Sequence, residues 1–258
     1  MDVTLSSAVR TTLDSTQRVS NLQARTQEHL ATGLRNDLLS NPQAVTVANS
    51  LSNRAADLLT TKDSLGQGAS AVGATVSGLE FISQLLDQAK AIATQYEGTS
   101  DPTQQAALTQ QFNVISQQID NAANDSSYGG TNLISSSPDT LNIPANGDGS
   151  SSITIQGAAS DSTSLGLTLS TASVDAAQSS VRSNIQSIAS NASVIGIRDN
   201  FNTNLVNSLQ DGAAKLTQAD LNEEAANSLS LQTRQQLSTF ATGIAAQSQQ
   251  SIVQLFGG

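Results

Sequence analysis

The stretch from Pro42 to Glu97, PQAVTVANSLSNRAADLLTTKDSLGQGASAVGATVSGLEFISQLLDQAKAIATQYE, decides the fold. Its apolar residues recur at alternating spacings of four and three, the repeat of a helix that packs along one face. With Asn41 as N-cap, Pro42 in the first helical position and Gly98 as C-cap, it predicts one helix of roughly 80 Å. The repeat comprises Ala44, Ala48, Leu51, Ala55, Leu58, Leu65, Ala69, Val72, Val76 and Leu79, then, after a slip of one residue, Ile82, Leu86, Ala89, Ala93 and Tyr96.

Two further segments carry the same apolar repeat. One holds Leu108, Phe112, Ile115, Ile119 and Ala122. The other begins near Val174, holds Val181, Ile185, Ile188, Ala192 and Ile195, and continues through Phe201, Leu205, Leu209 and Leu216. None of these helices is stable alone with one face so apolar, so they predict a mainly α fold, a long antiparallel helical bundle.

The segment between these helices, residues 128–170, has a different character. Gly129-Gly130, Pro138, Pro144 and Asn146-Gly147-Asp148-Gly149 are typical of turns. Short runs at 141–143, 153–155 and 165–169 are rich in residues that favour strands. They predict a small β-hairpin element, too small for a core of its own.

Both ends of the chain are amphipathic. Leu5, Val9, Thr12, Thr16 and Val19 keep helical spacing, as do Leu221, Ala225 and Leu229 near the other end. The two ends therefore predict a pair of helices packed as a stalk, separate from the main bundle. Such a pair buries little area alone, so neighbouring copies of the chain are the simplest source of further contacts.

Composition excludes several classes of function. Only 12% of the 258 residues are charged and 3% are aromatic, which favours helix seams and protein-covered surfaces over a compact globular core. The net charge of −10 argues against nucleic acid as a partner. No run of ~18 apolar residues predicts a membrane span, and the start of the chain lacks the basic and apolar regions of a secretory signal.

Candidate catalytic and metal sites are weak. His29 has no Cys or carboxylate constellation around it, so a solvated or packed residue explains it better than a metal ligand. Residues 66–71 match a dinucleotide-binding pattern by letter, but they follow a predicted helix instead of a strand. A helix that is flexible or closely approached at its glycines explains them better; these are Gly66, Gly68, Gly73 and Gly78. Asp220, Glu223 and Glu224 complement the dipole of the last helix. We predict no enzyme activity, no cofactor and no metal.

Three motifs resemble the bacterial flagellins. Residues 30–35 read LATGLR, followed by Asn41-Pro42 and Asn53-Arg54, as in the N-terminal signature of that family. Residues 128–134, YGGTNLI, resemble the point where the family leaves its second core helix for a β-hairpin. Residues 219–226, ADLNEEAA, followed by Gln232, Gln236, Gln249-Gln250 and Leu255-Phe256, resemble the flagellin C-terminus.

The resemblance implies a subunit of the bacterial flagellar filament, extracellular and used for swimming. Residues 1–42 and 218–258 would form an inner coiled-coil domain, and residues 43–217 an outer helical-bundle domain, with no variable outer domain. The self-assembly residues would be Leu5, Val9, Leu13, Val19, Leu22, Leu30, Leu34, Arg35, Leu221, Leu229, Leu237, Phe240, Ile244, Ile252, Leu255 and Phe256.

The family also implies particular partners. Besides the homopolymer itself, these are an export chaperone, the flagellar type III export apparatus, a filament cap and hook-junction proteins. The family's innate-receptor motif falls on residues 86–93, where Gln88 replaces a key arginine beside Lys90, so we expect weak recognition by that receptor. A hook–filament junction protein of the same architecture is the alternative function.

Overall fold

The computed structural model describes residues 7–35 and 41–256, and it confirms a mainly helical chain. The helices are α1 (Ser7–Thr32), α2 (Pro42–Gly98), α3 (Pro102–Asp125), α4 (Thr171–Thr217) and α5 (Leu221–Phe256). The chain forms two units, Met1–Leu51 with Asp211–Gly258, and Ser52–Gln210. The predicted boundaries at 42/43 and 217/218 stay a prediction about the assembled protein.

The starts of the long helices follow from side-chain caps. Asn41 Oδ1 accepts a hydrogen bond from the amide of Ala44 at 3.2 Å, which confirms Asn41 as the cap of α2. Asp101 Oδ1 accepts from Thr103 N at 2.9 Å, with Pro102 in the first position of α3. Glu97, near the end of α2, accepts from both the amide and the hydroxyl of Thr171, so α4 begins three residues earlier than predicted.

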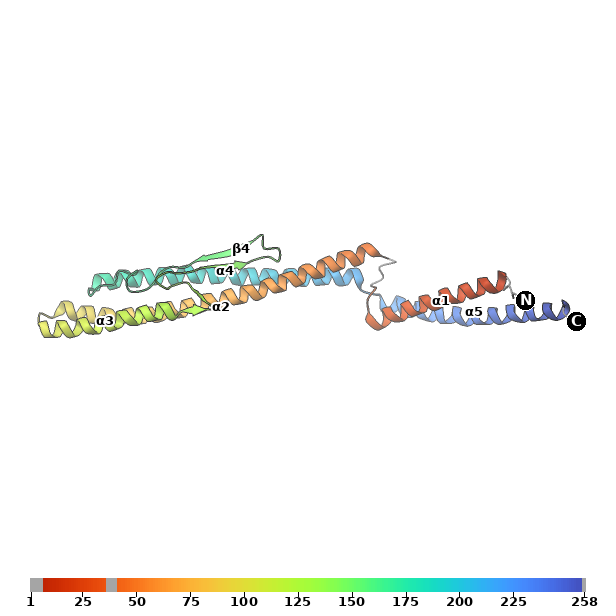
Figure 1. Cartoon of the computed structure of the whole chain (residues 1–258), viewed down its shortest axis with the longest axis horizontal. Coiled ribbons are helices and arrows are strands. Elements are labelled where there is room, and N and C mark those ends of the chain that lie inside the picture. Colours follow the sequence, from red (N-terminus) through yellow and green to blue (C-terminus); the bar gives the residue numbers. More distant parts are fainter. Residues whose placement is uncertain (1–6, 36–40, 257–258) are drawn as a thin grey trace. The chain divides into compact units, whose positions relative to one another are not determined.

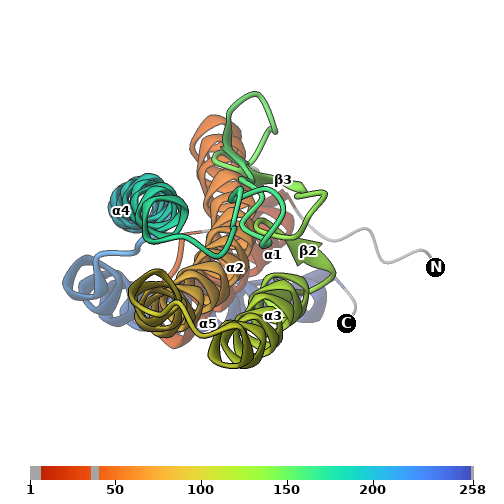
Figure 2. The same cartoon turned by 90° about the vertical axis from the view of Figure 1, so that its left-hand side faces the viewer.

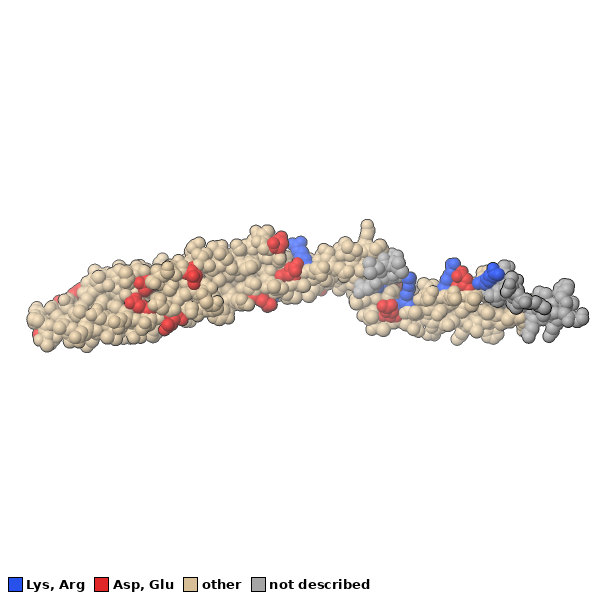
Figure 3. Space-filling view, viewed as in Figure 1, with Lys and Arg blue, Asp and Glu red and all other residues tan. Residues whose placement is uncertain are grey.

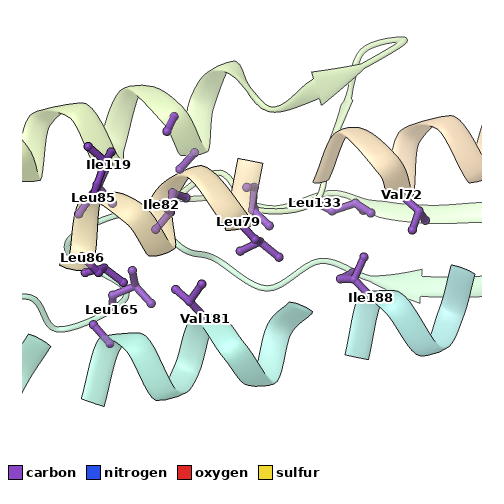
Figure 4. Packing of buried hydrophobic residues seen from close by; sticks show 14 of the residues in the cluster. Val72, Leu79, Ile82, Leu85, Leu86, Ile119, Leu133, Leu165, Val181 and Ile188 are labelled. Atoms are coloured by element: carbon purple, nitrogen blue, oxygen red, sulfur yellow. The ribbon is translucent and has the colours of Figure 1, made fainter. Parts of the chain in front are cut away.

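The core of the second unit lies where α2 packs between α3 and α4 (Figure 4). Leu79, Ile82 and Leu86 of α2 are fully buried there, as the predicted repeat requires. Lys62, which lies between Leu58 and Leu65 of that repeat, donates to the Thr203 hydroxyl of α4 at 2.6 Å. Viewed along the helices, α3 and α4 lie on different sides of α2 (Figure 2).

Two small antiparallel sheets connect α3 to α4. Strands β1 (Ser127–Tyr128) and β2 (Thr131–Asn132) flank Gly129 and Gly130, both with positive φ. Strands β3 (Thr140–Pro144) and β4 (Ser152–Gln156) pair in register, Thr140 opposite Gln156 and Pro144 opposite Ser152. The predicted hairpin is confirmed, with its turn at 145–151.

The predicted strand at 165–169 is wrong. Asp161 and Ser162 accept from the amides of Leu165 and Leu167 through their backbone carbonyls, so the segment closes local turns instead of joining a sheet. Gly166 has φ +63° within those turns. The alternating leucines were misleading because Leu165 and its neighbours pack on the helical core.

Two of the α2 glycines hold the connecting segment against the helix. A Cβ at Gly68 would collide with the Ile143 side chain of β3, and one at Gly78 would collide with Ser126. Gly66 and Gly73 face open space. Residues 66–71, which match the dinucleotide-binding pattern by letter, thus lie within a helix, as predicted. Close approach of other residues to the glycines is confirmed at Gly68 and Gly78 only.

Asn132 fastens the connecting segment to the end of α3. Its side-chain amide donates to the carbonyls of Ala123 and Asn124, at 2.8 and 2.9 Å. Its side-chain oxygen accepts from the amides of Ile134 and Ser135, both at 2.9 Å. All these partners are backbone groups, so one buried side chain determines how the chain leaves α3.

Helix α2 contains a window that a membrane helix would also satisfy by length and composition alone. Its mean hydropathy over 18 residues is 1.2, a level reached without an uninterrupted apolar run. Several large apolar residues of α2, among them Leu65, Leu79 and Leu86, are buried within the protein. That burial is what the core helix of a helical bundle requires.

Candidate self-assembly surface of the terminal helices

Helices α1 and α5 lie side by side and form the pair predicted from the two ends of the chain (Figure 1). Their least exposed residues recur at spacings of four and three, the repeat of a coiled-coil seam. Most of them are polar. The seam comprises Thr12, Thr16, Val19, Gln23, Thr26 and Leu30 of α1 and Glu224, Ser228, Leu231, Gln235, Ser238 and Thr242 of α5.

Among the described residues, hydrogen bonds cross this seam near its middle and near the start of α5. The hydroxyls of Thr16 and Ser238 are 2.6 Å apart. His29 Nδ1 lies 2.9 Å from Glu224 Oε1, with the two side chains only 15% and 12% exposed. The lone histidine is therefore a packed residue with a carboxylate partner on the other helix. Such bonds specify register more than they add stability, since each replaces a bond to water.

A short backbone connection closes the end of the pair. Gly33 has a positive φ after the end of α1, and Leu34 then forms an isolated antiparallel β-bridge with Gln218. The carbonyl of Gly33 accepts from Ala219 N at 2.9 Å. Asp220 caps α5 by accepting from the amide of Asn222, so the acidic start of α5 serves the helix terminus.

Four large apolar residues of α5 point away from α1. Leu229, Leu237, Phe240 and Ile244 are between 64% and 76% exposed. At 3.6 residues per turn, they lie about half a turn around the helix from the seam. We call these four residues the outer stripe of α5. On α1, Leu13 and Leu22 are also about half exposed and flank the seam.

The surface around the outer stripe is almost uncharged. No Lys, Arg, Asp or Glu follows Arg234 in the sequence. Covering four such side chains would contribute on the order of 5–10 kcal/mol of hydrophobic free energy. A helix segment with so little charge and this much exposed apolar area is typical of a surface that another protein covers.

The predicted self-assembly residues fall into three groups. Leu13, Leu22, Leu34, Arg35, Leu221 and the outer stripe are exposed. Val19 is buried and Leu30 is half-buried, both in the seam, so a single chain already covers most of these two side chains. Leu5 and the side chains of Val9, Ile252, Leu255 and Phe256 lie outside the described residues.

Sequence reasoning missed most of the seam because its residues are polar. The predicted repeat of the N-terminal helix ended at Val19, and Leu22, the next apolar residue, was predicted as a self-assembly residue. The structure instead continues the spacing through Gln23 and Thr26, which leaves Leu22 exposed. The regular spacing of Thr12, Thr16 and Val19 would have predicted the rest of the seam, had it been continued by residue number instead of by hydrophobicity.

A helical pair with a polar interior and an apolar exterior belongs to a particular class of protein. Its subunits complete their packing only by association, because the apolar area remains in water until a neighbouring copy covers it. The fold and this surface therefore define a self-assembling helical subunit.

Comparisons with known proteins identify the family. Residues 3–138 match the bacterial flagellin N-terminal helical region. Flagellin FljK of Caulobacter vibrioides is 31% identical over 81% of each chain, and a flagellin of Brucella melitensis is 27% identical over 98% of each chain. Bacillus cereus flagellin, a solved structure, is 20% identical with a TM-score of 0.41, covering 57% of this chain and 88% of that one.

The chain belongs to the bacterial flagellins. Members of this family are structural proteins, and the chain is a subunit of the flagellar filament, the extracellular appendage that serves motility. The family resemblance seen in the sequence is confirmed.

Proposed function

We propose that the filament assembles by covering the outer faces of α1 and α5 with the same helices of neighbouring copies. One observation supports this most: the contact between α1 and α5 is made mainly by polar residues, whereas the apolar residues of the outer stripe are exposed to water. The outer stripe holds four large apolar side chains, whereas the described seam contains three, Val19, Leu30 and Leu231, so association has more apolar surface to gain than intramolecular pairing.

The same proposal includes the export route and the partners of the subunit. The subunit leaves the cell through the flagellar type III apparatus with an export chaperone, and joins the filament beneath a cap and beyond the hook-junction proteins. It acts mechanically and performs no catalysis. Membership of the flagellin family supports this set of partners.

Recognition by the innate receptor of flagellins is weak in this proposal. Gln88 and Lys90 are both exposed on α2, and the Lys90 ammonium lies 2.7 Å from the Asp175 carboxylate of α4. Gln88 lacks the cationic fork that the family motif supplies at this position. A cell-reporter assay should give a low response, and Gln88→Arg should raise it; a full response to the unaltered chain contradicts this.

Seeded polymerisation tests the assembly mechanism. The full chain should elongate filament seeds without limit, as seen by electron microscopy, whereas a hook–filament junction protein would add a single collar. The double variant Leu237→Ser, Phe240→Ser should elongate at least tenfold more slowly, because it removes half of the outer stripe.

The matched control is Gln232→Ser, Gln236→Ser, which alters exposed polar residues of the same helix. It should elongate at the rate of the unaltered chain. Equal rates for the stripe variant and the unaltered chain would refute the mechanism.

A further inference from the structure

The turn between β3 and β4 contains a chemically labile pair of residues. Asn146-Gly147 is the only Asn-Gly pair in the sequence, and Gly147 is exposed. In such a pair the backbone nitrogen of the glycine can attack the side-chain carbonyl of the asparagine, because the glycine has no Cβ to obstruct the approach. The hairpin turn is therefore the place to look for a spontaneous covalent change.

Packing of the turn on α2 requires the glycine. A Cβ at Gly147 would lie 2.6 Å from the Cβ of Asp57 and 3.2 Å from the backbone carbonyl carbon of the same residue. Carbon atoms do not pack as closely as 2.6 Å, so a larger residue at 147 would push the turn away from α2. The labile pair is a consequence of how closely the turn approaches the helix.

Two hydrogen bonds hold the side-chain amide of Asn146 at both ends. Its Oδ1 accepts from Ser151 N at 3.1 Å, and its Nδ2 donates to Ser150 Oγ at 2.7 Å. The Asn146 side chain is also half-buried. Attack on the side-chain carbon takes that amide out of its plane and releases Nδ2, so the reaction strains both hydrogen bonds and breaks the second.

We propose that Asn146 is a site of spontaneous deamidation, and that Ser150 and Ser151 restrain the reaction in the folded protein. The Gly147 nitrogen bonds to the side-chain carbon of Asn146, and the bond from that carbon to Nδ2 breaks. Nδ2 leaves as ammonia, and the proton that the Gly147 nitrogen loses passes to it through solvent. Water then opens the succinimide and leaves aspartate or isoaspartate at position 146.

The reaction would loosen the hairpin from α4. The carbonyl of Ala145, directly before the site, accepts from Arg198 Nε at 2.8 Å and from Asn202 Nδ2 at 3.4 Å. Isoaspartate adds a methylene group to the main chain beside this carbonyl, and both products lack the donor to Ser150 Oγ. Ala145 is buried, so a lengthened main chain has no room to adjust without disturbing these bonds.

Both products also add a negative charge. The unit carries 13 acids and 5 bases, and acids predominate on its visible surface (Figure 3). The new carboxylate would share a surface hollow of about 440 Å³ with Asp57 and Asp148, but also with Arg54 and Arg198. Because the two arginines offset the added charge, the altered main chain is the larger effect.

Asp148-Gly149, in the same turn, forms a succinimide more slowly than Asn146-Gly147. The leaving group there is water, which requires the protonated carboxyl. The amide and the hydroxyl of Ser150 hold the pKa of the Asp148 carboxyl below its usual value. Ionised Asp148 is the poorer electrophile, so the turn reacts first at Asn146.

Peptide mapping by mass spectrometry tests the proposal on the full chain at neutral pH. It measures aspartate and isoaspartate at position 146 over time, with the same chain unfolded in urea as the unrestrained reference. The folded chain should react at least tenfold more slowly than the unfolded chain. Ser150→Ala removes the acceptor for Nδ2 and should raise the rate in the folded chain at least threefold. The matched control, Ser137→Ala, alters an exposed serine elsewhere between α3 and α4 and should leave the rate unchanged.

Hydrogen exchange distinguishes loss of the restraint from unfolding of the hairpin. In Ser150→Ala the amides of β3 and β4 should be protected at first and lose protection as isoaspartate accumulates. The proposal is overturned by equal rates in the folded and unfolded chain, by equal rates in Ser150→Ala and Ser137→Ala, or by a hairpin of Ser150→Ala that is unprotected from the start. Full protection after conversion would overturn the loosening from α4. The measurements use the monomer, so their outcome does not depend on filament assembly.

Discussion

Thr16 of α1 and Ser238 of α5 share a hydrogen bond of 2.6 Å across 222 positions of sequence. Two hydroxyls at the middle of a helix pair are an unusual choice, since Leu or Val at the same positions would bury more apolar area. The polar choice leaves the pair weak within one chain. The apolar residues of α5 are then kept for contacts outside the pair.

An apolar seam should therefore stabilise the pair. Replacing both hydroxyls, Thr16→Val with Ser238→Val, should raise the melting temperature of the α1–α5 helices in the monomer, followed by circular dichroism. The single variant Thr16→Val should gain less, because it leaves the Ser238 hydroxyl in the seam without its partner. A double variant that melts at or below the unaltered chain would contradict the role given to the seam.

The His29–Glu224 contact should contribute to the same pair. Glu224→Ala leaves the half-buried imidazole without its acceptor and should cost about 1–3 kcal/mol of pair stability. Glu224→Gln keeps an acceptor oxygen and should cost less. Hydrogen exchange of the α5 amides measures both, with the exposed Glu223→Ala as the control. Equal protection in Glu224→Ala and Glu223→Ala would show that the contact adds nothing.

Two glycines of α2 should respond oppositely to alanine. Gly68→Ala places a methyl group against Ile143 and should lower the free energy of unfolding by about 1–3 kcal/mol. Gly66→Ala meets nothing and should raise it by about 0.5–1 kcal/mol, the gain in helix propensity. Chemical denaturation of the two variants measures both changes in the free energy of unfolding. If both substitutions destabilise the protein, backbone freedom and not close packing requires these glycines.

Asn132 should matter more than its small size suggests. Asn132→Ala leaves two backbone carbonyls and two amides without their partner and should cost about 2–4 kcal/mol. Asn142→Ala removes one exposed bond, to Thr154, and should cost under about 0.5 kcal/mol. Thermal unfolding measures both variants. Similar melting temperatures would argue against a structural role for the Asn132 hydrogen bonds.

The sequence by itself determined the presence of the helices and the limits of α2. The repeat from Ala44 to Tyr96, the cap at Asn41 and the turn residues at 129–130 and 146–149 are local signals, and each predicts its element through neighbours in the chain. The hairpin strands followed for the same reason. The family signatures were likewise readable because they are runs of adjacent residues.

Only the tertiary structure decided which face of each helix is covered. Val19 and Leu22 are equally apolar, yet the first is buried and the second is exposed. Asn202 is buried and Phe201 is not, against the order of their hydrophobicity. The leucines at 165–169 pack on helices instead of forming a strand. Burial depends on which partner a helix meets and at what register. Those contacts join residues that are distant in the sequence, 57 positions apart for Asn202 and Ala145 and 222 for Thr16 and Ser238, where no local pattern records them.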